Sequence, residues 1–204
     1  MNKNKFQSNV KEWVRLSSEG QFLEAKSFYF DILFEDIINA FVERNADSFS
    51  GIDVLFSILG YSPEPIILTR HVLKPQKHVI FYHNVGEDFE KQIKPFLVKF
   101  MGGEYTLVEL KDLSFSTIYS TLKEQMVLLP ATQYAIDITG GKKSMVASAS
   151  IFARDYNFNV LYVDYDEYMP ALRRPMPGSE ILDLVYAPYR DLPDVRSLLD
   201  MARQ

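Results

Sequence analysis

Short apolar runs alternate with amphipathic stretches from residue 52 onward, and this alternation constrains the fold most strongly. Runs at 54–59, 79–83, 105–110, 134–138 and 160–164 are almost uniformly apolar, which is typical of strands buried on both faces of a sheet. A sixth strand is expected at 181–185, and the stretches between predict helices at 64–73, 88–101, 115–128 and 143–156. The sequence therefore predicts an α/β protein, with a mostly parallel sheet and helices on both faces.

A helical segment is expected before this unit, over residues 1–48. Its apolar residues fall at near-helical spacing on both sides of a turn at residues 17–20. The pattern predicts a helical hairpin that packs on the main domain or, alternatively, a module for partner binding or dimerisation. The expected domains are thus 1–48, 52–190 and a C-terminal helix within 191–204.

The charge balance excludes one class of function. The chain carries 22 basic and 27 acidic residues, a net charge of −5, whereas proteins that coat nucleic acid need a basic surface. Non-specific nucleic-acid binding is not expected, but a small anion can be held locally by a few N–H groups and lysines. With no cysteine, no signal-like N-terminus and no long apolar run, a cytoplasmic protein without membrane contact is expected.

The loop after the fourth strand carries the most informative pattern. Two glycines permit close approach of the backbone to a ligand, and the helix start that follows presents unpaired N–H groups. Two lysines and two hydroxyls add donors, so the loop suits a phosphate. The candidate ligand-binding residues are Thr139, Gly140, Gly141, Lys142, Lys143 and Ser144.

This loop is not a Walker A motif, because Ile136 stands where that motif needs its first glycine. The alternative interpretation is a tight strand-to-helix turn with two solvated lysines. The loop after the first strand is a second candidate, in which a helix start would face a phosphate and a tyrosine would stack on a base. Ser62 and Pro63 are equally explained as a helix cap and first turn. Its candidate residues are Gly60, Tyr61, Ser62 and Pro63.

Two arginines, Arg173 and Arg174, lie in a proline-rich segment and are candidates for phosphate or base contacts. The alternative is surface ion pairing with the acidic residues at 164–167. Those acidic residues favour a solvated loop over a metal site, and neither a metal nor a cofactor is expected. His83 at a strand end, and Asp88 with a Glu-x-Lys triplet at 109–111, are weaker signals.

Two separated motifs resemble a known family. The segments 54–65 and 137–145 are similar to the first-strand motif and the Asp-x-Thr-Gly-Gly-Thr-Lys-x-Met signature of CRISPR-associated Rossmann-fold (CARF) proteins, with Lys142 in place of the usual threonine. The Arg-Arg-Pro segment at 173–175 fits the same family. The resemblance covers residues 52–190 and implies a Rossmann-like fold.

The resemblance also implies a function. It implies a homodimeric sensor that binds cyclic oligoadenylate, with four or six adenylates, in type III CRISPR antiviral defence. An alternative is a metal-independent ring nuclease, in which Lys143 would stabilise developing charge, a role that Lys142 could share, and Ser62 would position the ribose. Another is a mononucleotide-binding module outside CRISPR. Family members usually carry an effector domain, so we expect either a stand-alone protein or part of a longer chain.

Overall fold

The computed structural model of the chain describes residues 3–45, 49, 51–83 and 89–191. Within these ranges the centre is a six-stranded sheet in the order β3-β2-β1-β4-β5-β8, parallel except for β8. Its strands are β1 (Val54–Ile58), β2 (Lys77–Tyr82), β3 (Thr106–Glu109), β4 (Tyr134–Asp137), β5 (Asn159–Tyr165) and β8 (Glu180–Tyr186). The predicted Rossmann-like α/β fold is confirmed. The strand order reverses between β1 and β4, where sheets of this type bind ligands.

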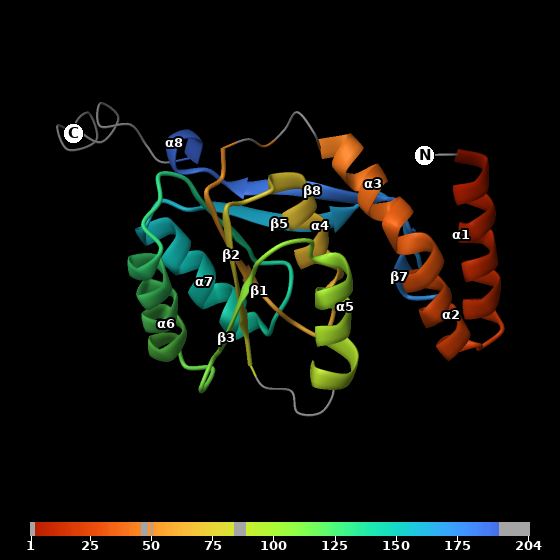
Figure 1. The fold of residues 1–204 in the computed structure, drawn as a ribbon, viewed down its shortest axis with the longest axis horizontal. Helices are drawn as coiled ribbons and strands as arrows, with labels where there is room; N and C mark the ends of the chain where they lie inside the picture. The colour runs from red at the N-terminus through yellow and green to blue at the C-terminus, as the bar shows by residue number, and fades with distance from the viewer. Residues whose placement is uncertain (1–2, 46–48, 50, 84–88, 192–204) are drawn as a thin grey trace, which may run out of the picture.

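Helices cover both faces of the sheet (Figure 1). They are α4 (Glu64–Leu73), the π-helical turn η2 (Phe89–Ile93) with α5 (Lys94–Phe100), α6 (Phe115–Leu128) and α7 (Lys143–Asp155). Alternate residues of β1 point to opposite faces. Phe56 belongs to the apolar core under α6 and α7, and Leu55 to the core under α4 and α5.

The N-terminal residues form a helical arm: α1 (Lys3–Ser18), α2 (Phe22–Phe28), the π-helical turn η1 (Tyr29–Leu33) and α3 (Phe34–Asn45). The second helix of the predicted hairpin thus consists of α2 and α3, which are joined by the π-helical turn η1. Trp13 and Phe34 are buried in the core that also contains α4 and α5, and the Phe34 ring lies 5.0 Å from that of Phe100. The arm therefore packs on the main domain.

The C-terminal part of the sheet differs from a continuous parallel arrangement. The proline-rich segment, expected as a loop, contains a short antiparallel hairpin of β6 (Tyr168–Met169) and β7 (Arg174–Pro175). After β8 comes α8 (Pro188–Asp191), and the closing helix expected at 192–202 lies outside the described residues. None of the described helices combines the length and apolar character needed to cross a bilayer.

Candidate functional site

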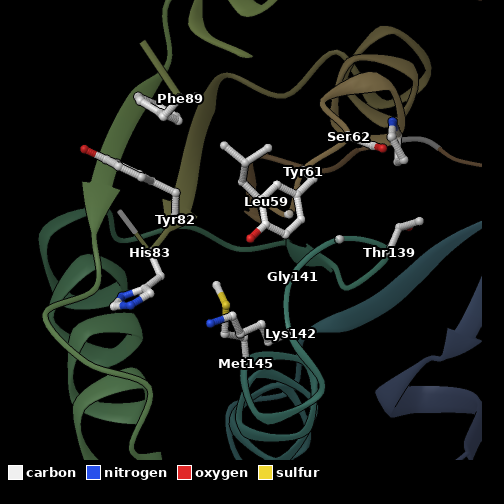
Figure 2. Close-up of a pocket in the computed structure, with 13 residues that line it drawn as sticks. Leu59, Tyr61, Ser62, Tyr82, His83, Phe89, Thr139, Gly141, Lys142 and Met145 are labelled. Atoms are coloured by element: carbon white, nitrogen blue, oxygen red, sulfur yellow. The ribbon is translucent and has the colours of Figure 1, made fainter. Parts of the chain in front are cut away.

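The loops that follow β1 and β4 and the end of β2 meet around a cavity of about 250 Å³ at the carboxyl edge of the strands. We call it the glycine-loop cavity. Figure 2 shows Tyr61 facing Lys142 and Met145 across it, with Tyr82 and His83 at the β2 side. Seven of the predicted ligand-binding residues line it: Gly60, Tyr61, Ser62, Thr139, Gly140, Gly141 and Lys142.

The floor of this cavity is a contact between two backbones. A Cβ atom added to Gly60 would lie 2.6 Å from the amide nitrogen of Gly141, which is closer than real Cβ atoms come. Gly141 itself has φ +86°, a conformation that favours glycine. The glycines in both motifs therefore let the β1 and β4 loops touch, and this contact brings the two predicted loops into one site.

The β4 loop is anchored by the buried carboxyl of Asp137. Its Oδ1 accepts hydrogen bonds from the N–H and the hydroxyl of Thr139 at 2.9 and 2.6 Å, and its Oδ2 accepts one from the Thr69 hydroxyl at 3.1 Å. The hydroxyl oxygen of Thr139 in turn accepts a hydrogen bond from the Val163 N–H at 2.8 Å. Burial raises the pKa of Asp137, although these hydrogen bonds oppose the shift. The network fixes the position where the loop leaves the sheet.

Two helices begin at the cavity without a side-chain cap. The first intrahelical bond of α7 runs from the Val146 N–H to the Lys142 carbonyl, and that of α4 from the Ile67 N–H to the Pro63 carbonyl. Neither Lys142 nor Pro63 forms a side-chain cap hydrogen bond, whereas Ser114 caps α6 by accepting from the Thr117 N–H. The amides before the first bond of α7 lack an intrahelical partner, and the helix dipole is positive there. The start of α4 offers fewer donors, because Pro63 and Pro65 have no N–H and the N–H of Glu64 bonds its own carboxyl. Such an arrangement suits an anion.

The remaining predicted residues lie elsewhere. Pro63 and Arg174 line a second, adjacent cavity of about 640 Å³. Lys143, Ser144 and Arg173 are exposed and line neither cavity. Of the two residues expected to act in ring cleavage, Ser62 therefore lies at the site, and Lys142 rather than Lys143 lies beside it.

Sequence reasoning missed Tyr82, Phe89 and Met145 as wall residues and gave His83 only as a weak signal. Tyr82 and Phe89 stack with ring centroids 4.4 Å apart at one side of the glycine-loop cavity, and Met145 and His83 complete it. The Nδ1 of His83 lies 3.0 Å from the Leu110 carbonyl oxygen, so Nδ1 carries the proton and donates. The position of His83 at the end of β2 was the available signal, because all parallel strands end at this edge.

The weaker motifs find no support among the described residues. The acidic residues at 164–167 do not gather into a metal-binding group within the part of the chain that is described. Asp166 pairs with Arg44 of α3 at 3.3 Å, not with the arginines of the hairpin. Asp88 of the nuclease-like pattern lies outside the described residues.

The sequence is similar to that of a curated CRISPR protein. No protein-family model matches the chain. Over 153 residues, 69% of this chain, the sequence is 30% identical to the CRISPR system endoribonuclease Csm6 of Thermus thermophilus. The chain spans 30% of the length of that relative.

Among solved structures, Can2 of Sulfobacillus thermosulfidooxidans in complex with cyclic tetra-adenylate matches 60% of this chain and 36% of its own, at 16% identity and a TM-score of 0.48. Csm6 of Enterococcus italicus bound to cyclic hexa-2′-fluoro-hexa-dAMP matches 57% of this chain and 34% of its own, at 15% identity and a TM-score of 0.44.

The sheet topology and the cavity at its switch point define a Rossmann-like α/β domain with a ligand-type cavity at the carboxyl edge. The similarity to Csm6 confirms the predicted resemblance to CRISPR-associated Rossmann-fold proteins.

Proposed function

We propose that the chain is a CARF-type sensor that binds cyclic oligoadenylate in type III CRISPR defence. The observation that carries the proposal is that the loop leading into α4 and the uncapped start of α7 line one cavity, through Ser62 and Lys142. Backbone amides and a helix dipole stabilise phosphate without a basic surface, which fits a chain of net charge −5. The motif resemblance and the similarity to Csm6 favour this ligand class over other anions.

Lys142 provides the side-chain cation in this proposal. It is exposed, lines the glycine-loop cavity and precedes the first turn of α7. An ammonium group there adds to the positive end of the helix dipole. Ser62 and Thr139 line the same cavity and offer hydroxyl groups to a phosphate or a ribose.

The proposal includes a homodimer. The glycine-loop cavity, at about 250 Å³, is below the roughly 300–1,000 Å³ of ordinary ligand pockets and holds only part of a ring of four or six nucleotides. A second copy related by a two-fold axis would duplicate the site around one symmetric ring.

Isothermal titration with cyclic tetra-adenylate, cyclic hexa-adenylate and AMP tests the proposal. We expect saturable binding of a ring by the wild type and a loss of about 1.5–3 kcal/mol for Lys142→Ala, as for a hydrogen bond to a charged group. Lys111→Ala is the matched control, because Lys111 is exposed and lines neither cavity. Equal binding by the Lys142 and Lys111 variants would contradict the assignment.

The same samples separate the two alternative functions. Linear products ending in 2′,3′-cyclic phosphate, formed without added metal, identify a ring nuclease. Binding of AMP as tight as that of either ring identifies a mononucleotide module instead of a ring sensor.

A further inference from the structure

The second cavity lies between the N-terminal arm and the carboxyl edge of the sheet. It has a volume of about 640 Å³, and Tyr61, Ser62, Pro65 and Thr139 line both it and the glycine-loop cavity. A ligand held at the glycine loops can therefore extend from one cavity into the other. The size of the second cavity is within the usual range for small-molecule sites.

Aromatic rings form much of its wall. Trp13 of α1 and Tyr29 of η1 lie with ring centroids 5.7 Å apart, and Phe30 stacks on Phe96 at 3.8 Å. Tyr61, which is 70% exposed, stands at the boundary with the glycine-loop cavity. Tyr61 offers an accessible ring to a flat ligand that stacks, as nucleic-acid bases do, whereas Trp13 and Phe30 are buried.

Polar groups with unmet hydrogen bonds interrupt these apolar walls. Glu64 at the start of α4 lines the cavity and is partly exposed, yet its buried Oε2 has no hydrogen-bond partner among the described residues. The buried indole Nε1 of Trp13 likewise has none. Buried polar atoms are normally paired, so an unpaired one in a cavity wall is available to a ligand that enters the cavity. A carboxyl group turns easily about its terminal torsion and can present either oxygen.

Burial shifts the ionisation of Glu64 toward the neutral acid. Burial raises the pKa of Glu64, and its own backbone N–H, Arg174 and Lys26 only partly oppose this shift. Another carboxyl that lines the cavity, Glu180, has its pKa raised to about 7, chiefly by burial. A neutral carboxylic acid offers one donor beside one acceptor, the pattern by which a glutamine side chain pairs with the N7 and amino edge of adenine.

We propose that the second cavity is a base subsite for adenine, a flat ring with an amino group beside a ring nitrogen, and that Glu64 contacts that edge. The proposal rests on the proposed function, since it places the phosphate of the same nucleotide at the glycine loops. It also gives the N-terminal arm a role, because Trp13 and Tyr29 form one wall of the subsite. Hypoxanthine, which has an oxygen in place of the amino group, mismatches this edge.

Adenosine and inosine test the subsite without involving the phosphate contacts. Trp13 is the only tryptophan of the chain, so its indole N–H resonance reports occupancy of the cavity in a ¹H–¹⁵N spectrum. We expect the wild type to bind adenosine at least tenfold more tightly than inosine. Glu64→Gln, which keeps a donor beside an acceptor, should retain that preference, and Glu64→Met should abolish it.

Equal binding of the two nucleosides by the wild type, no saturable adenosine binding, or a preference that persists in Glu64→Met would overturn the subsite. Thermal unfolding shows whether each variant is folded; if Glu64→Met does not fold, loss of the preference in Glu64→Gln overturns the proposal equally. The titrations of wild type and Lys142→Ala with cyclic oligoadenylate are independent of the nucleoside titrations. Failure of the sensor proposal is therefore distinguishable from failure of the base subsite.

Discussion

Gly60 and Gly141 lie back to back, so that a Cβ atom on Gly60 would lie only 2.6 Å from the amide nitrogen of Gly141. The two glycines belong to loops that are far apart in the sequence but follow adjacent parallel strands, β1 and β4. Their contact makes the glycine-loop cavity a property of two loops together. The shape of the cavity thus depends on the absence of a side chain at position 60.

Substitution of Gly60 by alanine should push the two loops apart. The added methyl group meets backbone, which moves less readily than a side chain, so we expect a loss of about 1–3 kcal/mol in unfolding free energy. We also expect ring binding to be lost, because the helix starts no longer face one cavity. Urea unfolding and calorimetric titration measure the two effects.

Gly20→Ala is the control for this substitution. Gly20 has a positive φ of +77°, unlike Gly60, but an added Cβ there meets open space, and Gly20 lines neither cavity. The control should lose some stability through backbone strain and keep full ring binding. Normal ring binding by folded Gly60→Ala would show that the close contact does not shape the site.

Thr139→Val should destabilise the chain at the anchor of the β4 loop. Valine keeps the shape but removes the hydroxyl that donates to Asp137 and accepts from the Val163 N–H. Unpaired buried groups cost about 1–3 kcal/mol, which urea unfolding detects. Thr139→Ser should recover most of the loss, and the exposed Thr132→Val should change stability by less than about 0.5 kcal/mol. If Thr139→Val were as stable as the wild type, the hydrogen bonds between Asp137 and Thr139 would not anchor the β4 loop.

Glu180 should make stability depend on pH. Its pKa rises from 4.5 in an unfolded chain to about 7. Burial is the main cause and the charge of Glu64 adds to it, whereas the Gly178 amide and Arg44 lower the pKa. The folded state therefore binds the proton more tightly. The resulting stabilisation is complete below about pH 4.5 and is lost as the pH rises through 7, by about 3 kcal/mol.

The difference between wild type and Glu180→Gln isolates this contribution. His78, whose pKa burial lowers to about 3, acts in the opposite direction but is present in both proteins and cancels. Between pH 5 and pH 7.5 the wild type should lose stability relative to Glu180→Gln in urea unfolding. The exposed Glu167→Gln should show the wild-type dependence, and parallel curves for wild type and Glu180→Gln would refute the buried-carboxyl account.

The sequence predicted the elements that depend on local patterns. The bounds of α4 and α6 agree with the expected helices, because helical periodicity and their first residues are local signals. The antiparallel direction of β8 was not predicted, since the apolar pattern of a strand does not indicate whether it pairs parallel or antiparallel. The β6–β7 hairpin was taken for a loop because its prolines weaken any strand pattern.

The site was also predicted only in part, because only some of its residues are marked by local sequence patterns. Gly60 and Gly141 were recognised because both follow strands that end at one edge of the sheet. The side chains of Lys142 and Lys143 could not be told apart, because which one faces the cavity depends on how α7 begins. Trp13 and Glu64 come together only through packing of the arm, which spacing in the sequence does not encode.

Backbone amide shifts on addition of cyclic tetra-adenylate test the central claim most directly. That claim is that the loop leading from β1 into α4 and the start of α7 donate N–H groups to one bound anion. A ¹H–¹⁵N titration should give its largest changes at the amides of 60–62 and 140–145, with downfield movement expected for amides that donate to phosphate. Saturable binding that leaves both of these segments unshifted would contradict the account.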